Sequence, residues 1–183
     1  MAPHAGVART PTSQTGEERL PSAPGNNPDY RRAWSRFATG VTVITTVEPD
    51  GTPHGMTANA ITSVALEPPL ALVCISHART TFRLIAESGK FGMSVLGADQ
   101  RATAEYFARR PEDREGDPPS GYTSADGRHP VIEGALSTFE CEVVSAHEEG
   151  DHTIFVGRVQ AYETQDGEPL MWYESAFGGL QSG

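Results

Sequence analysis

The pattern of apolar and polar residues along the chain predicts a protein built mainly from β-strands. Several stretches are rich in β-branched and aromatic residues, and two of them alternate apolar with polar residues over more than ten positions. These two stretches are separated only by Glu148–Asp151, which predicts an antiparallel hairpin. The expected strands lie at 41–47, 54–76 (as two strands), 91–96, 136–147, 152–164 and 170–173.

Helical periodicity is limited to short segments. Pro28 is suited to a first helical turn, Tyr30, Trp34 and Phe37 then share one helical face, and Gly40 ends the segment. Few helices among many strands favour a closed or nearly closed antiparallel barrel. Two further short helices are predicted over 80–88 and 99–108.

The stretch from His54 to Ser76 contains no Lys or Arg and begins with small and hydroxyl-bearing residues. We expect two strands here around a corner at Pro68–Pro69, because proline is excluded from the interior of a sheet. Small residues on a strand indicate that a flat or polar group approaches the backbone. A Thr/Ser-rich edge strand facing water is the alternative that the pattern leaves open.

Two segments lack a regular pattern. Residues 1–27 are rich in Pro, Ser, Thr, Gly and Ala, and they are expected to form a disordered tail because they cannot bury enough apolar surface. An arm that wraps a second subunit remains the alternative. Residues 109–130 are expected to form a long loop, which in a compact domain is usually functional or disordered. A single domain should therefore cover residues 28–183.

The composition of the chain excludes some partners and indicates where the protein is located. The formal charge of -10 argues against nucleic acid or an anionic membrane as the main partner. The first 27 residues show no secretory signal and no apolar run is long enough to span a bilayer, so we expect a cytoplasmic protein.

Cys74 and Cys141 lie in strand-like runs without metal-ligand spacing, which indicates reduced thiols and no metal site. No GxGxxG motif follows a strand, and no P-loop motif is present.

Four segments, in order, resemble the flavin reductase-like family of small split-barrel proteins that reduce FMN or FAD with NAD(P)H. The resemblance runs from about Tyr30 to Leu180. It is carried by RFATGVTV (36–43), GMTANA (55–60) with Ser63 and Pro68–Leu70, FGMSVL (91–96) and GDHTIFVG (150–157).

The resemblance implies the fold and the site. It implies a split antiparallel β-barrel of the FMN-binding type with a few short peripheral helices. It also implies that His152 approaches the nicotinamide, with Asp151 and Phe177 on the NAD(P)H side. The implied flavin-binding residues are Thr57, Ala58, Asn59, Ala60, Ser63, Ser76, Arg79, Thr80, Thr81 and Phe91.

The residues themselves are suited to this chemistry. Backbone N–H groups and short hydroxyls match the pyrimidine edge of an isoalloxazine ring. Arg79 ahead of a helix beginning near Thr80–Thr81 can bind a phosphate, although helix capping alone also explains the threonines. The family has serine where this chain has Arg79. Arg109, Arg110, Arg114 and Arg128 could meet nucleotide phosphates, but a solvated loop is the better explanation for them.

We therefore expect an NAD(P)H:flavin oxidoreductase that supplies reduced FMN or FAD to a partner monooxygenase. The resemblance also implies a homodimer. Two alternatives stay open: a flavoprotein oxidase or oxygenase that retains FMN and acts on an organic substrate, and a non-catalytic flavin-binding module.

Overall fold

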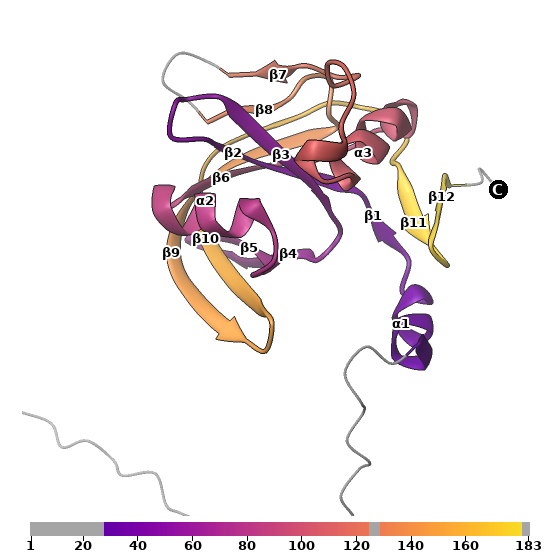
Figure 1. Cartoon of the computed structure of the whole chain (residues 1–183), viewed down its shortest axis with the longest axis horizontal. Coiled ribbons are helices and arrows are strands. Elements are labelled where there is room, and N and C mark those ends of the chain that lie inside the picture. Colours follow the sequence, from indigo (N-terminus) through magenta and orange to yellow (C-terminus); the bar gives the residue numbers. More distant parts are fainter. Residues whose placement is uncertain (1–27, 125–128, 181–183) are drawn as a thin grey trace, which may run out of the picture.

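A computed structural model describes residues 28–124 and 129–180 of the chain, and this part is mostly β-structure (Figure 1). The prediction of a mainly β fold with a few short helices is confirmed. The helices are α1 (Pro28–Ser35), α2 (Thr80–Ser88) and α3 (Arg101–Ala108), with 3-10 turns η1 (Ala98–Gln100) and η2 (Pro111–Asp113). The strands are β1 (Thr39–Gly40), β2 (Thr42–Val47), β3 (Pro53–Ala58), β4 (Ile61–Leu66), β5 (Pro69–Ser76), β6 (Lys90–Val95), β7 (Tyr122–Thr123), β8 (Val131–Ile132), β9 (Ser137–Glu149), β10 (His152–Thr164), β11 (Met171–Tyr173) and β12 (Ala176–Gly178).

Seven strands form one antiparallel sheet in the order β3-β2-β6-β9-β10-β5-β4. The predicted long hairpin is present as β9 and β10, and it lies in the middle of this sheet. The two edge strands, β3 and β4, follow each other along the chain and are joined only by Asn59 and Ala60. Because so short a link spans no more than about 10 Å, the sheet must curve until the ends of its two edges meet (Figure 1). No pairing joins β3 to β4 among the described strands, so this sheet is not a closed barrel.

The core consists of two apolar clusters, and β2 separates them. Successive side chains of a strand point to opposite faces, and β2 is buried almost throughout because both of its faces are covered. Ile44 packs into the cluster that includes Phe91 and Phe155, whereas the neighbouring Val43 packs with Phe107 in the other cluster. Helix α2 contributes Ile85 to the first cluster and α3 contributes Ala104 to the second.

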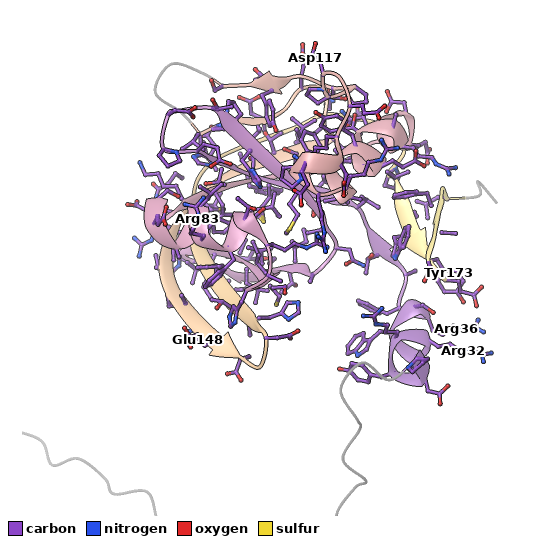
Figure 2. The ribbon with its side chains drawn as sticks, in the orientation of Figure 1. Arg32, Arg36, Arg83, Asp117, Glu148 and Tyr173 are labelled. Atoms are coloured by element: carbon purple, nitrogen blue, oxygen red, sulfur yellow. The ribbon has the colours of Figure 1, made fainter. Side chains whose placement is uncertain are left out.

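A small sheet of β1, β11 and β12 lies beside the main sheet (Figure 1). The hairpin turn between β11 and β12 consists of Glu174 and Ser175, whose φ angles are 48° and 62°. Non-glycine residues rarely adopt such angles, so the surroundings must hold this turn. Arg36 does so, since it forms an ion pair of 2.6 Å with Glu174 and donates a hydrogen bond of 3.3 Å to the Tyr173 hydroxyl (Figure 2). The strand β12 was not predicted.

The predicted loop 109–130 is more ordered than its composition suggests. Arg114 is half-buried, and its guanidinium donates a hydrogen bond of 2.8 Å to the Gly55 carbonyl on β3. It also lies over the rings of Tyr106 and Phe107. Burial lowers the pKa of Arg114. The interpretation of Arg114 as a solvated loop residue is therefore wrong, because this arginine fastens the loop to the sheet.

Helix α1 forms where it was predicted, although it ends at Ser35 rather than near Gly40. None of its residues is buried. The side chains of Tyr30, Trp34 and Phe37 stack edge to face, yet each is more than half exposed. The apolar face of α1 is therefore left uncovered by the described part of this chain.

The predicted disordered tail, residues 1–27, lies outside the described residues. Among the helices that the structure does describe, none combines the length and the apolar character needed to cross a membrane.

Candidate functional site

The site is organised around the break between β3 and β4. The sequence predicted one strand from His54 to the proline corner, but the chain leaves β3 after Ala58 and begins β4 at Ile61. The Ala60 carbonyl accepts a hydrogen bond of 2.9 Å from the Cys74 amide on β5. The chain thus crosses from one edge of the sheet to the other, and Asn59 and Ala60 are exposed at the crossing.

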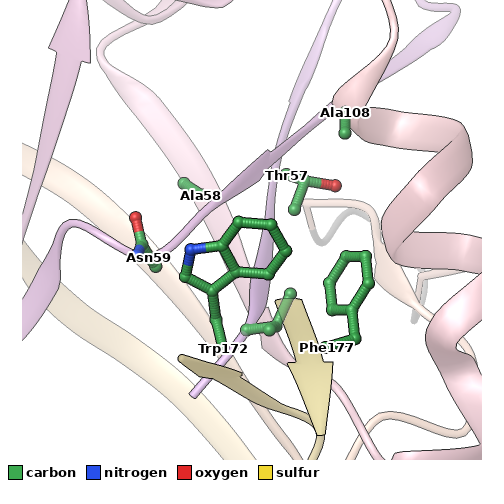
Figure 3. Close-up of a pocket in the computed structure, with 7 residues that line it drawn as sticks. Thr57, Ala58, Asn59, Ala108, Trp172 and Phe177 are labelled. Atoms are coloured by element: carbon green, nitrogen blue, oxygen red, sulfur yellow. The ribbon is translucent and has the colours of Figure 1, made fainter. Parts of the chain in front are cut away.

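One cavity lies on β3 just before this break and has a volume of about 210 Å³. The indole of Trp172 and the ring of Phe177, from β11 and β12, meet edge to face with their centroids 4.8 Å apart. In Figure 3 the indole lies between Asn59 and Phe177. The cavity is lined by Val41, Thr57, Ala58, Asn59, Ala108, Trp172 and Phe177.

Some polar groups at this end of β3 already form hydrogen bonds within the protein. The Thr57 hydroxyl donates a hydrogen bond of 2.6 Å to the Ala104 carbonyl of α3. The Asn59 amide donates one of 3.2 Å to the Thr39 hydroxyl, while its carbonyl oxygen has no partner within residues 28–124 and 129–180. Asn59, which directly follows β3, is therefore the side chain best placed here to bind a polar ring edge.

A second and larger cavity, about 500 Å³, lies where β5 meets β10. His152 is paired with Ser76 in the register of these strands, and the His77 amide donates a hydrogen bond to the Asp151 carbonyl. The strand pairing thus brings residues 76–81, which were predicted to bind the flavin phosphate, next to Asp151 and His152, which were predicted to bind NAD(P)H. The cavity is lined by Arg31, Ser76, Ala78, Arg79, Thr80, Arg110, Pro111, Glu112, Asp151 and His152.

Asp151 fixes the orientation of the His152 ring. The Nδ1 of His152 lies 2.7 Å from the Oδ1 of Asp151, and this hydrogen bond lowers the pKa of the Asp151 carboxyl. The Nε2 of His152 has no partner in the part of the chain that the structure describes. The imidazole is thus held at one nitrogen and presents the other for a ligand.

The structure corrects two predicted flavin contacts. Phe91 is fully buried in the core, where its ring lies close to Gly157 on β10 and Cys141 on β9. Thr81 is also buried, and its hydroxyl lies 3.0 Å from the Nε2 of His54. Neither side chain is accessible to a cofactor, so these two predictions are wrong.

Most of the remaining predicted residues divide between the two cavities. Thr57, Ala58, Asn59 and Phe177 line the first, and the residues of the phosphate segment line the second together with Asp151 and His152. Phe177, which was expected beside His152, is thus found beside Asn59. Two predicted residues, Ala60 and Ser63, line neither cavity.

Sequence reasoning missed several lining residues. Trp172 lies in a strand that was predicted, but nothing in its spacing linked it to β3. Arg110 was considered as a phosphate ligand and set aside, and Arg31 was assigned only to a helix. Both cysteines, Cys74 and Cys141, are free thiols, and no group of three or more His, Cys, Asp or Glu in the described segments is placed to bind a metal ion.

Comparison with known proteins places this chain in a family. Residues 34–181 match the family model described as a flavin reductase like domain. An NADH-dependent flavin reductase from a Rhodococcus species is 42% identical over 154 residues, covering 82% of this chain and 85% of the relative.

Solved structures agree with this match. The flavin reductase of the styrene monooxygenase from Pseudomonas putida S12 superposes with a TM-score of 0.78 at 35% identity, covering 85% of this chain and 99% of the other. An NADH:FAD oxidoreductase from Streptomyces globisporus, solved with NAD and FAD fragments, gives a TM-score of 0.78 at 32% identity and covers 87% and 95%. The chain belongs to the flavin reductase-like family.

Proposed function

We propose that this protein reduces FMN or FAD with NADH or NADPH and releases the reduced flavin to a separate flavin-dependent monooxygenase. The observation that carries the proposal is the cavity in which Thr57, Ala58 and Asn59 meet the ring pair of Trp172 and Phe177. The reductase names of the relatives support it.

The lining of the first cavity suits the flat end of a flavin. Its walls are small residues of β3 on one side and aromatic rings on the other, a combination that suits a planar, mostly apolar ring system. The free carbonyl oxygen of Asn59 and the exposed backbone after Ala58 can bind the polar pyrimidine edge. Trp172 and Phe177 would keep the ring flat against the strand.

The second cavity fits the phosphate end. Ser76, Arg79 and Thr80 offer hydroxyls and a guanidinium, the groups that bind a phosphate well. Ser76 lies two residues after Cys74, whose amide is bonded to Ala60, so the two regions are separated by about 7 Å along β5. A single flavin mononucleotide can therefore extend from Asn59 to the turn before α2.

His152 would orient the second substrate. Asp151 holds its Nδ1, so the Nε2 can donate or accept a hydrogen bond at the nicotinamide carboxamide. When bound, an oxidised flavin accepts a hydride from NAD(P)H and a proton from water, and it leaves in its reduced form. The chain's own contribution is to bring the two rings together and exclude water, which is catalysis by proximity and orientation.

A second copy of the chain would complete the site. The first cavity measures about 210 Å³, below the range of about 300–1,000 Å³ that is typical of ligand pockets. The exposed aromatic face of α1 also requires a cover. We propose a homodimer, a split-barrel arrangement of the curved sheet, and a cytoplasmic location where NAD(P)H is supplied and both thiols stay reduced.

Steady-state oxidation of NADH and of NADPH, with FMN, FAD and riboflavin added singly, tests the proposal. We expect turnover that depends on added flavin, and protein that loses its flavin on desalting. Flavin that stays bound in stoichiometric amounts would favour the alternative of an oxidase or oxygenase. Bound flavin that NAD(P)H never bleaches would contradict the proposal and favour a binding module.

A further inference from the structure

The hairpin of β11 and β12 forms one wall of the first cavity, and few backbone pairs attach it to the rest of the fold. Each of its strands has three residues, and β1, the strand beside it, has two. Strand β12 pairs with β11 and with no other described strand. Trp172 and Phe177 lie opposite each other in this hairpin, next to Tyr173 and Ala176, the pair that closes the turn. The position of the Phe177 ring therefore depends on the turn.

The turn decides which face of the hairpin the Phe177 ring occupies. It consists of Glu174 and Ser175, and both have positive φ angles, 48° and 62°, as a two-residue turn of type I′ requires. Asparagine and glycine favour such a turn, whereas glutamate and serine adopt positive φ angles at a cost. If the turn relaxed to a longer loop, the register of β12 would shift. A shift of one residue moves every side chain of a strand to the opposite face, so Phe177 would leave the cavity wall.

Contacts from the end of α1 hold the turn in its conformation. The Glu174 amide donates a hydrogen bond of 2.9 Å to the Ser35 carbonyl. The Nη1 of Arg36 lies 2.6 Å from the Oε1 of Glu174 and 3.3 Å from the Tyr173 hydroxyl (Figure 2). Both side chains of this ion pair are about half exposed, and an exposed ion pair contributes little to the stability of a whole domain. Arg36 is therefore suited to select the conformation of one turn rather than to stabilise the fold.

We propose that Arg36 is a positioning residue for the flavin: by holding this turn, it keeps the Phe177 ring opposite β3, where the flavin ring binds. The inference rests on the proposed function and adds to it a residue that lines neither cavity. Because the contacts of Arg36 act on the ring cavity, their loss should weaken binding of the flavin ring system and leave the phosphate contacts intact.

The test uses riboflavin, which lacks the phosphate and so reports on the ring cavity alone. Dissociation constants for riboflavin and FMN are measured by quenching of flavin fluorescence in the wild type, in Arg36→Gln and in a matched control, Arg83→Gln. Arg83 forms a similarly exposed ion pair with Glu87 and lines neither cavity. Arg36→Gln should raise both dissociation constants about fivefold, or about 1 kcal/mol. Its melting temperature should stay unchanged, and the control should change none of these values.

A rescue variant tests whether Arg36 acts through the turn. The double substitution Glu174→Asn with Ser175→Gly introduces the sequence that favours this turn without an ion pair. The rescue variant should bind riboflavin as the wild type does. Adding Arg36→Gln to it should have no further effect, because the turn no longer needs to be held.

Three results would overturn the inference. The first is wild-type affinity for riboflavin in Arg36→Gln. The second is a loss of affinity that persists when Arg36→Gln is combined with the rescue substitutions, because Arg36 would then act elsewhere. The third is a loss confined to FMN, which would mean that the charge of Arg36 attracts the phosphate. The proposed function is tested separately, since it fails if the wild type does not oxidise NADH or NADPH when flavin is added.

Discussion

His152 is the side chain that we expect to contact the nicotinamide. Its imidazole is 46% exposed and oriented by Asp151. Replacing it with alanine should lower kcat/KM for NADH about five- to thirtyfold, the loss of about 1–2 kcal/mol that follows removal of one positioning hydrogen bond. Stopped-flow bleaching of the flavin measures the effect. The dissociation constant for flavin and reduction by dithionite should not change, and bleaching at the wild-type rate would show that His152 is only a turn residue.

His54 makes the stability of the protein depend on pH. It is buried between Glu48 and Thr81, and desolvation lowers its pKa below the ordinary value of 6.5. Burial lowers the pKa of His129 in the same direction. Because the unfolded chain binds protons more readily than the folded one in this range, the free energy of unfolding should fall as the pH drops below 6.5.

The variant His54→Gln separates the two histidines. Urea denaturation at about pH 7.5 and about pH 5.5 should show a smaller loss of stability in this variant than in the wild type. The remaining loss belongs to His129 and to the carboxylates. An unchanged difference between the two pH values would mean that His54 does not contribute.

Single residues also mark the limit of sequence reasoning. Thr81 and Phe91 were predicted to bind flavin because of the motifs around them, yet both side chains are buried in the interior of the protein. Motif matching gives the position of a residue in a segment but not the direction of its side chain. For Thr81 that direction depends on His54, which is 27 residues away.

At the scale of elements, β10 can lie in the middle of the sheet because Gly157 leaves room for Phe91. A Cβ atom at Gly157 would lie 2.7 Å from the Phe91 ring and 2.8 Å from the Cys141 Cβ. The variant Gly157→Ala should therefore lower the free energy of unfolding by about 1–3 kcal/mol, as overpacking of a core does. Urea denaturation measures this loss.

Gly40→Ala is the matched control, because no atom lies within 4 Å of the added Cβ. It should change the stability much less than Gly157→Ala. Equal stability of the two variants would mean that the core around Phe91 adjusts freely.

Elements with strong local signals were predicted well. Helix α2 ends as expected at Gly89, which has a φ of 67°, and the long hairpin has its predicted partners. The break at Asn59–Ala60 could not be predicted, because the hydrogen bond between Ala60 and Cys74 that fixes it is a tertiary contact. The turn at Glu174–Ser175 lacks the glycine or asparagine that usually marks such a hairpin.

For the molecule as a whole, we expect a homodimer to which residues 1–27 contribute little. Their composition offers no apolar face, so their deletion should leave the melting temperature and the NADH oxidation rate nearly unchanged. Light scattering should give twice the chain mass of 19.6 kDa before deletion, and twice the mass of the shortened chain after it. A shift to monomer on deletion would show that the tail is an intersubunit arm.

The central claim places the flavin ring on β3 at Asn59, opposite Trp172. The chain has only two tryptophans, so in the variant Trp34→Phe the remaining fluorescence belongs to Trp172. Titration of this variant with FMN should quench the emission in a saturable manner. Adding Asn59→Leu, which places a bulky side chain in the cavity, should raise the dissociation constant at least about tenfold.

The control is Thr62→Leu in the same background, because Thr62 is exposed on β4 and lines neither cavity. It should leave the titration unchanged. Equal FMN affinity in the Asn59→Leu and Thr62→Leu variants would contradict the placement of the flavin on β3.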